Sequence, residues 1–143
     1  MKEGKQYPWS KFLNLKTIFW FLTAITVAVS LQQYFLPERN FWDAMRPQYN
    51  NYLIFKFSFA HLIDGLNLYH AHPEDHGDFF KYSPTFALFM GLFYYLPDWL
   101  GLIFWNLLNT LCLYAGIRFL PDLKDKTRVF ILLYVLLELI GNL

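Results

Sequence analysis

The chain has 143 residues, of which 56% are hydrophobic and 22% aromatic, whereas only 16% are charged. Soluble domains usually carry about 25% charged residues. Here the charges are clustered, with none over residues 17–37 and none between Lys81 and Asp98. A helix needs about 20 mainly apolar residues to cross a bilayer, which is the length of these gaps. The composition therefore excludes an ordinary soluble domain and predicts an integral membrane protein.

The N-terminal segment, residues 1–16, is basic, since it holds four lysines and a single acid, Glu3. Positive charge beside a first span favours the cytoplasmic side of the membrane. Residues 17–36 are the predicted first transmembrane helix. A cleaved signal peptide is the less favoured alternative, because the apolar run is longer than a signal core and no small-residue cleavage site follows it.

Residues 37–78 form a long polar and aromatic section that lies outside the cytoplasm if the first helix crosses. Within it, apolar residues recur every three or four positions and predict a helix near 52–64 that is too short to cross. Lys56 and His61 fall on its other side, and Gly65 is the predicted stop. Such a helix lies in the membrane interface with its aromatic face in lipid or against other helices, or it is a buried core helix.

Residues 79–97 and 99–117 are the predicted second and third transmembrane helices, with Pro84 in the first turn of the second. A charged connector, residues 118–128, separates them from 129–143, the start of a further membrane helix. Three crossings put this connector outside, yet it holds four bases and two acids, which the positive-inside rule would place in the cytoplasm. Either 79–97 is re-entrant, or the N-terminal lysines outweigh the connector; we favour the second explanation.

Two asparagines in the third predicted helix, Asn106 and Asn109, are three residues apart and share a face. We expect them to form hydrogen bonds between helices, because amides in lipid seek partners. Glu138 lies in the last apolar segment, where an ionisable residue is functional by default. The net charge of +1 gives no reason to expect nucleic acid as a partner.

A cluster of histidines and acids stands just before the second predicted helix, in "YHAHPEDHGDFF", residues 69–80. Imidazole and carboxylate groups are good ligands for zinc and similar ions. However, the spacing matches no established metal motif, and Pro73 and Gly77 indicate a turn rather than a fixed cage. A solvated loop is the favoured interpretation, followed by catalysis or substrate binding, and then by a metal site.

Three stretches have a familiar order: "DGLNLY" (64–69), "KYSPTFALFMGLFYYLP" (81–97) and "WNLLN" (105–109). With the basic N-terminus, single span and long external section, they resemble the GT-C membrane glycosyltransferases, and most of all glycosyltransferase family 87. This family contains polyprenyl-phosphate-mannose-dependent mannosyltransferases. Its members typically show a G-x-D-L-Y turn, then Y-P-P-x-F-A-L, a Leu-Pro turn and L-W-x-x-L-N.

The resemblance covers about residues 40–120 and implies an all-α, polytopic, GT-C-like membrane fold. The chain is then expected to be the N-terminal portion of a longer protein, cut after three to four spans and inactive alone. In the family an aspartate acts as general base on the acceptor hydroxyl. That position falls on Asn51, whose amide can orient a hydroxyl but cannot accept a proton. Ser83 stands where the family has its first proline.

Transfer from a lipid-phosphate sugar needs a base near the acceptor hydroxyl and cations near the leaving phosphate. We therefore expect the base to be another group, and the candidate catalytic residues are Asp78, His76 and Asp43. Lys56, Lys81 or Arg46 is the candidate phosphate ligand, arginine by bidentate hydrogen bonds and lysine as a point charge. The expected substrate-binding residues are Asn51, Lys56, Lys81, Glu74 and Tyr82.

The resemblance thus implies a glycosyltransferase that moves a hexosyl, most simply a mannosyl, unit from a polyprenyl-phosphate donor to an extracytoplasmic glycan or lipid. The expected partners are the lipid bilayer, this donor, and a glycan or glycolipid acceptor. The expected location is the plasma (inner) membrane, multi-pass, with the N-terminus in the cytoplasm. No cofactor is expected, with a divalent metal as the less favoured alternative. The competing hypothesis is a non-enzymatic membrane protein, a transporter fragment or scaffold, whose external loop binds a partner.

Overall fold

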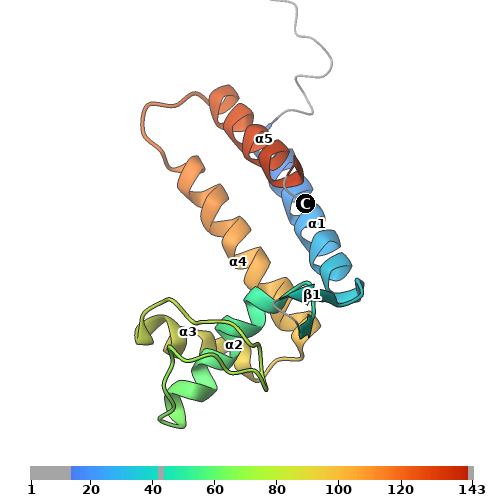
Figure 1. The fold of residues 1–143 in the computed structure, drawn as a ribbon. Coiled ribbons are helices and arrows are strands. Elements are labelled where there is room, and N and C mark those ends of the chain that lie inside the picture. Colours follow the sequence, from blue (N-terminus) through green and yellow to red (C-terminus); the bar gives the residue numbers. More distant parts are fainter. Residues whose placement is uncertain (1–13, 42–43, 142–143) are drawn as a thin grey trace, which may run out of the picture. The chain divides into compact units, whose positions relative to one another are not determined.

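The computed structural model describes residues 14–41 and 44–141, with the side chains of all of these except residues 41 and 138–141. Over these residues it contains five helices and one two-stranded hairpin (Figure 1). The prediction of a mostly helical chain is confirmed. The chain divides into two compact units, one made of residues up to 27 together with 107 onward, the other of residues 28–106.

The two longest helices are α1 (Leu15–Phe35) and α4 (Asp98–Arg118), with 21 residues each. At 1.5 Å per residue each is about 31 Å long, which matches the roughly 30 Å hydrocarbon core of a bilayer. Only 22% of the most apolar stretch of each helix is buried. Both helices are therefore long and apolar enough to cross a membrane, and their bounds lie close to the predicted 17–36 and 99–117.

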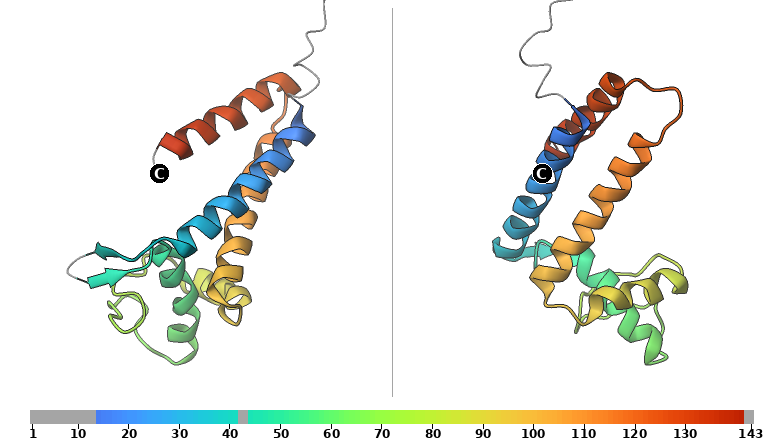
Figure 2. Two further views of the ribbon diagram at one scale, coloured as in Figure 1. Left: turned by 90° about the vertical axis from the view of Figure 1, so that its right-hand side faces the viewer. Right: turned by 180° about the vertical axis from the view of Figure 1, so that it is seen from behind.

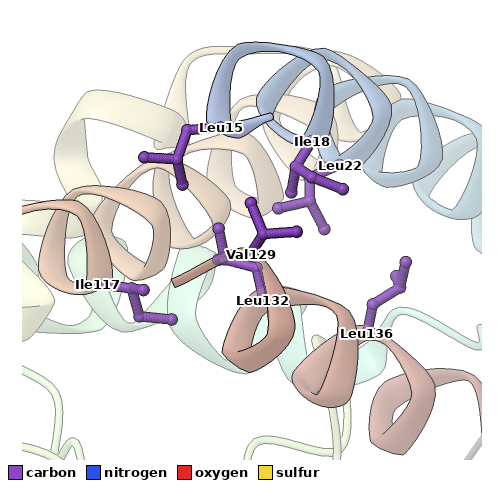
Figure 3. Packing of buried hydrophobic residues seen from close by; sticks show 7 residues of the cluster. All are labelled: Leu15, Ile18, Leu22, Ile117, Val129, Leu132 and Leu136. Atoms are coloured by element: carbon purple, nitrogen blue, oxygen red, sulfur yellow. The ribbon is translucent and has the colours of Figure 1, made fainter. Parts of the chain in front are cut away.

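The first unit has an aliphatic core formed by the beginning of α1, the end of α4 and α5 (Asp125–Gly141) (Figure 3). Between α1 and α4, the Thr26 and Thr110 hydroxyls are 2.8 Å apart, and the Tyr114 hydroxyl donates to the Leu15 carbonyl. Helix α5 begins inside the predicted 118–128 connector, where Arg128 pairs with Asp125 at 2.7 Å. The buried core residues are Leu15, Ile18, Leu22, Ile117, Val129, Leu132 and Leu136. Glu138 lies in α5, and its side chain is outside the described part of the chain.

In the second unit, the end of α1 is followed by a short antiparallel hairpin, β1 (Arg39–Phe41) and β2 (Ala44–Arg46), visible in Figure 2. Its register places Arg39 opposite Arg46. The tip of the hairpin, which includes the predicted catalytic residue Asp43, lies outside the described residues. In this unit the Asn106 amide donates to the Ser30 hydroxyl at 2.9 Å. The expected interhelical role of Asn106 is thereby confirmed.

Helix α2 (Asn50–Ile63) is mostly buried, because eight of its 14 residues are shielded from solvent. The predicted stop, Gly65, follows the C-cap residue Asp64 and has a left-handed conformation with φ +68°. The Gly65 N–H donates to the Leu62 carbonyl, and the Leu66 N–H donates to the His61 carbonyl, which is a Schellman cap. Of the two sequence interpretations, the structure favours the buried core helix over the interfacial one.

Helix α3 (Pro84–Tyr94) packs against α2 and has 11 residues. Its length of about 16 Å is half of what a crossing needs, so it is much shorter than the predicted 79–97 transmembrane helix. A residue that precedes proline is pushed to extended backbone, and Ser83 has ψ 154°. The helix therefore cannot begin before Pro84, which occupies its first turn as predicted. The Ser83 hydroxyl caps it by accepting from the Phe86 N–H.

Candidate functional site

Three buried histidines, His61, His72 and His76, gather in the second unit, with exposed fractions of 3%, 9% and 1%. His61 comes from α2, and the other two come from the loop before α3. The His61 and His72 rings stack with their centroids 3.7 Å apart. His61 Nε2 lies 2.7 Å from the Asp75 carboxylate. The acid and histidine cluster of the sequence is thus folded against α2 and is not a fully solvated loop.

The loop takes this shape because the His72 carbonyl accepts three backbone N–H groups, from Asp75, His76 and Gly77. Gly77 has φ +67°, which favours glycine. A Cβ at Gly77 would collide with the Arg46 guanidinium. Arg46 also donates to the Pro73 carbonyl at 2.9 Å. The close turn therefore wraps around an arginine of the β hairpin.

His76 is neutral at physiological pH, because burial, followed by the nearby His61, lowers its pKa from 6.5 to about 4. Its Nδ1 accepts the Asp78 backbone N–H at 3.3 Å, which places its proton on Nε2. That Nε2 atom is buried and has no hydrogen-bond partner within the described structure. The His76 ring consequently supports the loop and has no access to an exposed acceptor in this conformation.

The cluster does not have the geometry of a metal centre. His72 Nδ1 lies 3.3 Å from the Glu74 carboxylate, and its Nε2 lies 3.0 Å from the Asn67 carbonyl. Both partners accept hydrogen bonds, and a neutral ring has a single N–H, so it can donate to only one of them at a time. Over the described residues, no three side chains of histidine, cysteine, aspartate or glutamate are grouped so that they could hold a metal ion.

A second feature, which we call the arginine pocket, adjoins this loop. It is a cavity of about 120 Å³ lined by Arg39, Arg46, Pro47, Asn50 and Asn51. Two positive side chains meet here because Arg39 and Arg46 are paired across the hairpin. Guanidinium groups bind phosphate and carboxylate oxygens in a bidentate manner. The pocket therefore has the chemistry of an anion site.

The beginning of α2 adds to this positive character. Tyr49, the residue before the helix, makes no side-chain hydrogen bond that would cap it. The beginning of a helix carries a partial positive charge, although in α2 the Asn50 and Tyr52 N–H groups already donate to the Pro47 and Tyr49 carbonyls. The pocket adjoins the histidine loop through Asn50, whose amide donates to the His76 carbonyl at 3.1 Å, and through Arg46.

The structure places the predicted catalytic residues differently. Asp78 is half-buried, and its carboxylate accepts the Phe79 N–H at 2.6 Å. Asp78 and His76 are adjacent in the histidine loop, as their spacing requires. Neither belongs to the lining of the arginine pocket, and none of the five residues that line it is an acid.

The predicted substrate-binding residues are also dispersed. Asn51 lines the arginine pocket. Lys56 is 7% exposed, and its ammonium donates to Asp98 at 2.6 Å and to the Leu96 carbonyl at 2.8 Å. Its charge is thus already balanced. Glu74 and Lys81 are exposed, and the Glu74 pKa is lowered, first by a hydrogen bond from its own backbone. Tyr82 packs its ring against Phe55.

Sequence inspection missed Arg39, Asn50 and His61 as site residues. Arg39 and Arg46 are seven positions apart, and only the hairpin between them brings the two together. His61 was placed on the polar face of the 52–64 helix, but nothing in its spacing relates it to His72 and His76. A hairpin signal such as Asn-Gly at its tip would have indicated the pairing, and the sequence does not carry one.

No family model, curated protein or solved structure matches this chain. The resemblance to glycosyltransferase family 87 therefore stays a prediction.

Proposed function

We propose that this chain is part of a polytopic, GT-C-type glycosyltransferase of the plasma (inner) membrane, with its N-terminus in the cytoplasm. It would transfer a hexosyl unit, most simply mannose, from a polyprenyl-phosphate donor to an extracytoplasmic glycan or glycolipid. The observation that carries the proposal is the arginine pocket, which begins four residues after α1 ends at Phe35.

The position of the pocket supports a lipid-linked donor. If α1 crosses the bilayer, Phe35 lies near the far interface, and Arg39 stands at the depth of lipid headgroups. The phosphate of a polyprenyl-phosphate sugar lies at the same depth, while its chain remains in the hydrocarbon. Arg39 and Arg46 can hold this phosphate by bidentate hydrogen bonds, and Asn51 can orient a sugar or acceptor hydroxyl.

The reaction we propose is a displacement at the anomeric carbon. The acceptor hydroxyl oxygen forms a bond to this carbon, the bond between the carbon and the phosphate oxygen breaks, and the polyprenyl phosphate leaves with the electron pair. The hydroxyl proton passes to a base, for which Asp78 is our candidate among the described residues. The arginines stabilise the negative charge that develops on the leaving phosphate.

A non-enzymatic membrane protein is the second candidate, and a specific observation favours it. The pocket is lined by an amide, Asn51, at the position where the family resemblance implies an acid. A binding protein needs the arginines but no base. Such a protein would retain lipid-phosphate binding without catalysing transfer.

The test is transfer by the full-length protein in proteoliposomes that contain radiolabelled polyprenyl-phosphate mannose and a mixed glycan acceptor, with and without chelator. We expect transfer that survives chelation. We also expect the rate of sugar transfer to fall at least tenfold in Arg39→Gln, because weakening one charge-assisted hydrogen bond has an effect of about this size. Lys124→Gln, a substitution of a base outside the pocket, is the matched control and should keep full transfer.

Two results decide between the candidates. Donor binding without any transfer, lost in Arg39→Gln, would identify a binding protein. Neither binding nor transfer by the wild-type protein would reject the arginine pocket as a lipid-phosphate site. Thermal unfolding of Arg39→Gln shows whether a loss of transfer comes from a loss of fold.

A further inference from the structure

Helix α3 exposes a continuous apolar stripe. Leu88, Phe89, Leu92 and Tyr95 have exposed fractions of 59%, 39%, 71% and 79%. Leu88, Phe89 and Leu92 lie in α3, and Tyr95 is the residue that follows it, still with helical backbone. The four follow one another at helical spacing and so share a face. A contiguous apolar stripe is unusual on a surface that faces water. It is more unusual here because another face of the same helix is already buried.

The opposite face of α3 is already occupied. Ala87 and Met90 are fully buried, and Phe93 packs edge-on against Trp105 at the beginning of α4. Gly91 faces the Phe59 ring of α2. The helix therefore does not need its exposed stripe to be held in place within the second unit.

The length and ends of α3 limit how deep it can lie in a membrane. Its 11 residues reach about 16 Å, half of the hydrocarbon thickness. The chain turns before it at Ser83 and after it at Pro97, and Asp98 starts α4 directly. A short apolar helix between two turns can enter one leaflet and return, but it cannot reach the other side.

The charge of the 118–128 connector agrees with such a return. If α3 does not cross, only α1 and α4 cross before the connector, and it returns to the side of the basic N-terminus. The connector holds four bases against two acids. This is the side on which the positive-inside rule places such a segment, so the conflict found in the sequence disappears.

We infer that α3 lies in the outer leaflet, with the stripe Leu88, Phe89, Leu92 and Tyr95 against lipid. Residues 37–97 then lie wholly on the outer side, and the connector lies in the cytoplasm. The lipid is the partner of this surface. The inference rests on the membrane location that the proposed function includes, but not on the transferase chemistry.

The first test is the side of the connector in the full-length protein. In a Cys112→Ser background, single cysteines are placed in the connector, as Lys124→Cys, and in the exposed loop before α3, as His70→Cys. An impermeant maleimide is applied to intact cells and to permeabilised cells. We expect His70→Cys to react in both preparations and Lys124→Cys to react only after permeabilisation.

Labelling of both cysteines in intact cells, or of neither, would overturn the inference, because the two positions would then share a side and α3 would cross. Carbonate extraction of the membranes separates this result from a protein that is not embedded at all. The sugar-transfer assay is an independent measurement, so a failed transferase and a failed topology give different results.

The second test asks what covers the stripe. A spin label on Leu92→Cys is compared with one on His70→Cys for collisions with oxygen, which enters lipid, and with a nickel chelate, which stays in water. We expect the Leu92 label to favour oxygen at least tenfold relative to the His70 label. An equal preference would place the stripe in water, and low collision with both reagents would place it under protein; either result would overturn the inference.

Discussion

Helices α2 and α3 pack against each other in the second unit, yet they distribute their side chains in opposite ways (Figure 1). Helix α2 buries polar groups, among them Lys56, Ser58 and His61. Helix α3 exposes large apolar ones, with Leu92 at 71%. Water-soluble domains usually bury apolar side chains and expose charged ones, so both patterns would be unusual in such a domain.

The difference shows what surrounds each helix. Burying a polar group costs least where it is hydrogen-bonded. In α2, Lys56, Ser58 and His61 Nε2 have partners in Asp98, Asp75 and backbone carbonyls, whereas Asn50 Oδ1, the Tyr52 hydroxyl and His61 Nδ1 have none among the described residues. Exposing an apolar side chain costs no free energy where its surroundings are themselves apolar, as they are in lipid. The pair is therefore consistent with α2 as an internal support and α3 as the side that faces lipid.

The largest effect we expect is the acid sensitivity of the histidine cluster that packs on α2. The His76 pKa is about 4 in the folded chain, against 6.5 for an ordinary histidine, chiefly because of burial. Between these values the unfolded chain holds a proton that the folded chain does not. The unfolding free energy therefore falls as pH decreases through this window, by at most about 3 kcal/mol.

Four charged or titratable groups face His76 in this window. His61 and His72 oppose its protonation, whereas Asp75 and Asp78 favour it. The unfolding free energy is measured by denaturant unfolding in detergent at about pH 7 and about pH 5. It should fall less between these pH values in His76→Asn than in the wild type. The asparagine side-chain oxygen can still accept the Asp78 N–H. His70→Asn is the exposed control. Equal acid sensitivity in His76→Asn and the wild type would disprove the role of His76.

The second effect concerns the ion pair of α2. In Lys56→Met the methionine keeps the apolar stem but leaves Asp98 and the Leu96 carbonyl without their donor. Loss of one partner of a buried pair costs about 3–5 kcal/mol. The Asp98 side chain is 36% exposed, so water replaces part of the interaction, and we expect a loss of about 2–3 kcal/mol.

Unfolding in denaturant, followed by tryptophan fluorescence, measures this loss. Lys81→Met, which removes an exposed lysine, is the matched control and should change the unfolding free energy by less than about 0.5 kcal/mol. A Lys56→Met protein as stable as this control would mean that the pair with Asp98 contributes nothing.

The third effect tests the contact between α2 and α3 directly. A Cβ at Gly91 would lie 2.6 Å from the Phe59 ring, so Gly91→Ala should force the ring aside. Overpacking of this kind costs about 1–3 kcal/mol, and alanine recovers part of it as a better helix former. We expect a net loss of about 1–2 kcal/mol in unfolding free energy.

Gly116 provides the matched control, because a Cβ there meets no atom within 4 Å. Gly116→Ala has only the helix-propensity gain and should stabilise the chain by about 0.5–1 kcal/mol. The two glycines thus predict changes of opposite sign. A gain of stability in Gly91→Ala would show that α2 and α3 do not pack as described.

The comparison of α2 with α3 also explains what could be predicted from the sequence. Local signals were sufficient for the stop of α2 at Gly65 and for the place of Pro84 in the first turn of α3, but not for the beginning of either helix or for the end of α3. Apolar length alone suggested a spanning helix over 79–97, although Pro84 itself signals that the residue before it is held extended and that a helix begins there. The arginine pocket depends on a non-local pairing, Arg39 with Arg46, that no periodicity reveals.

The smallest effect concerns the beginning of α3. In Ser83→Ala the Phe86 N–H loses the hydroxyl that accepts it, at a rather long 3.3 Å. Loss of an N-cap costs about 0.5–2 kcal/mol, and the length of this hydrogen bond favours the lower half of that range. Ser83→Asn, which can still cap the helix, should restore the wild-type unfolding free energy. If Ser83→Ala and Ser83→Asn have the same unfolding free energy, the cap does not determine where α3 begins, and Pro84 does. The exposed stripe is then the main determinant of where this helix lies.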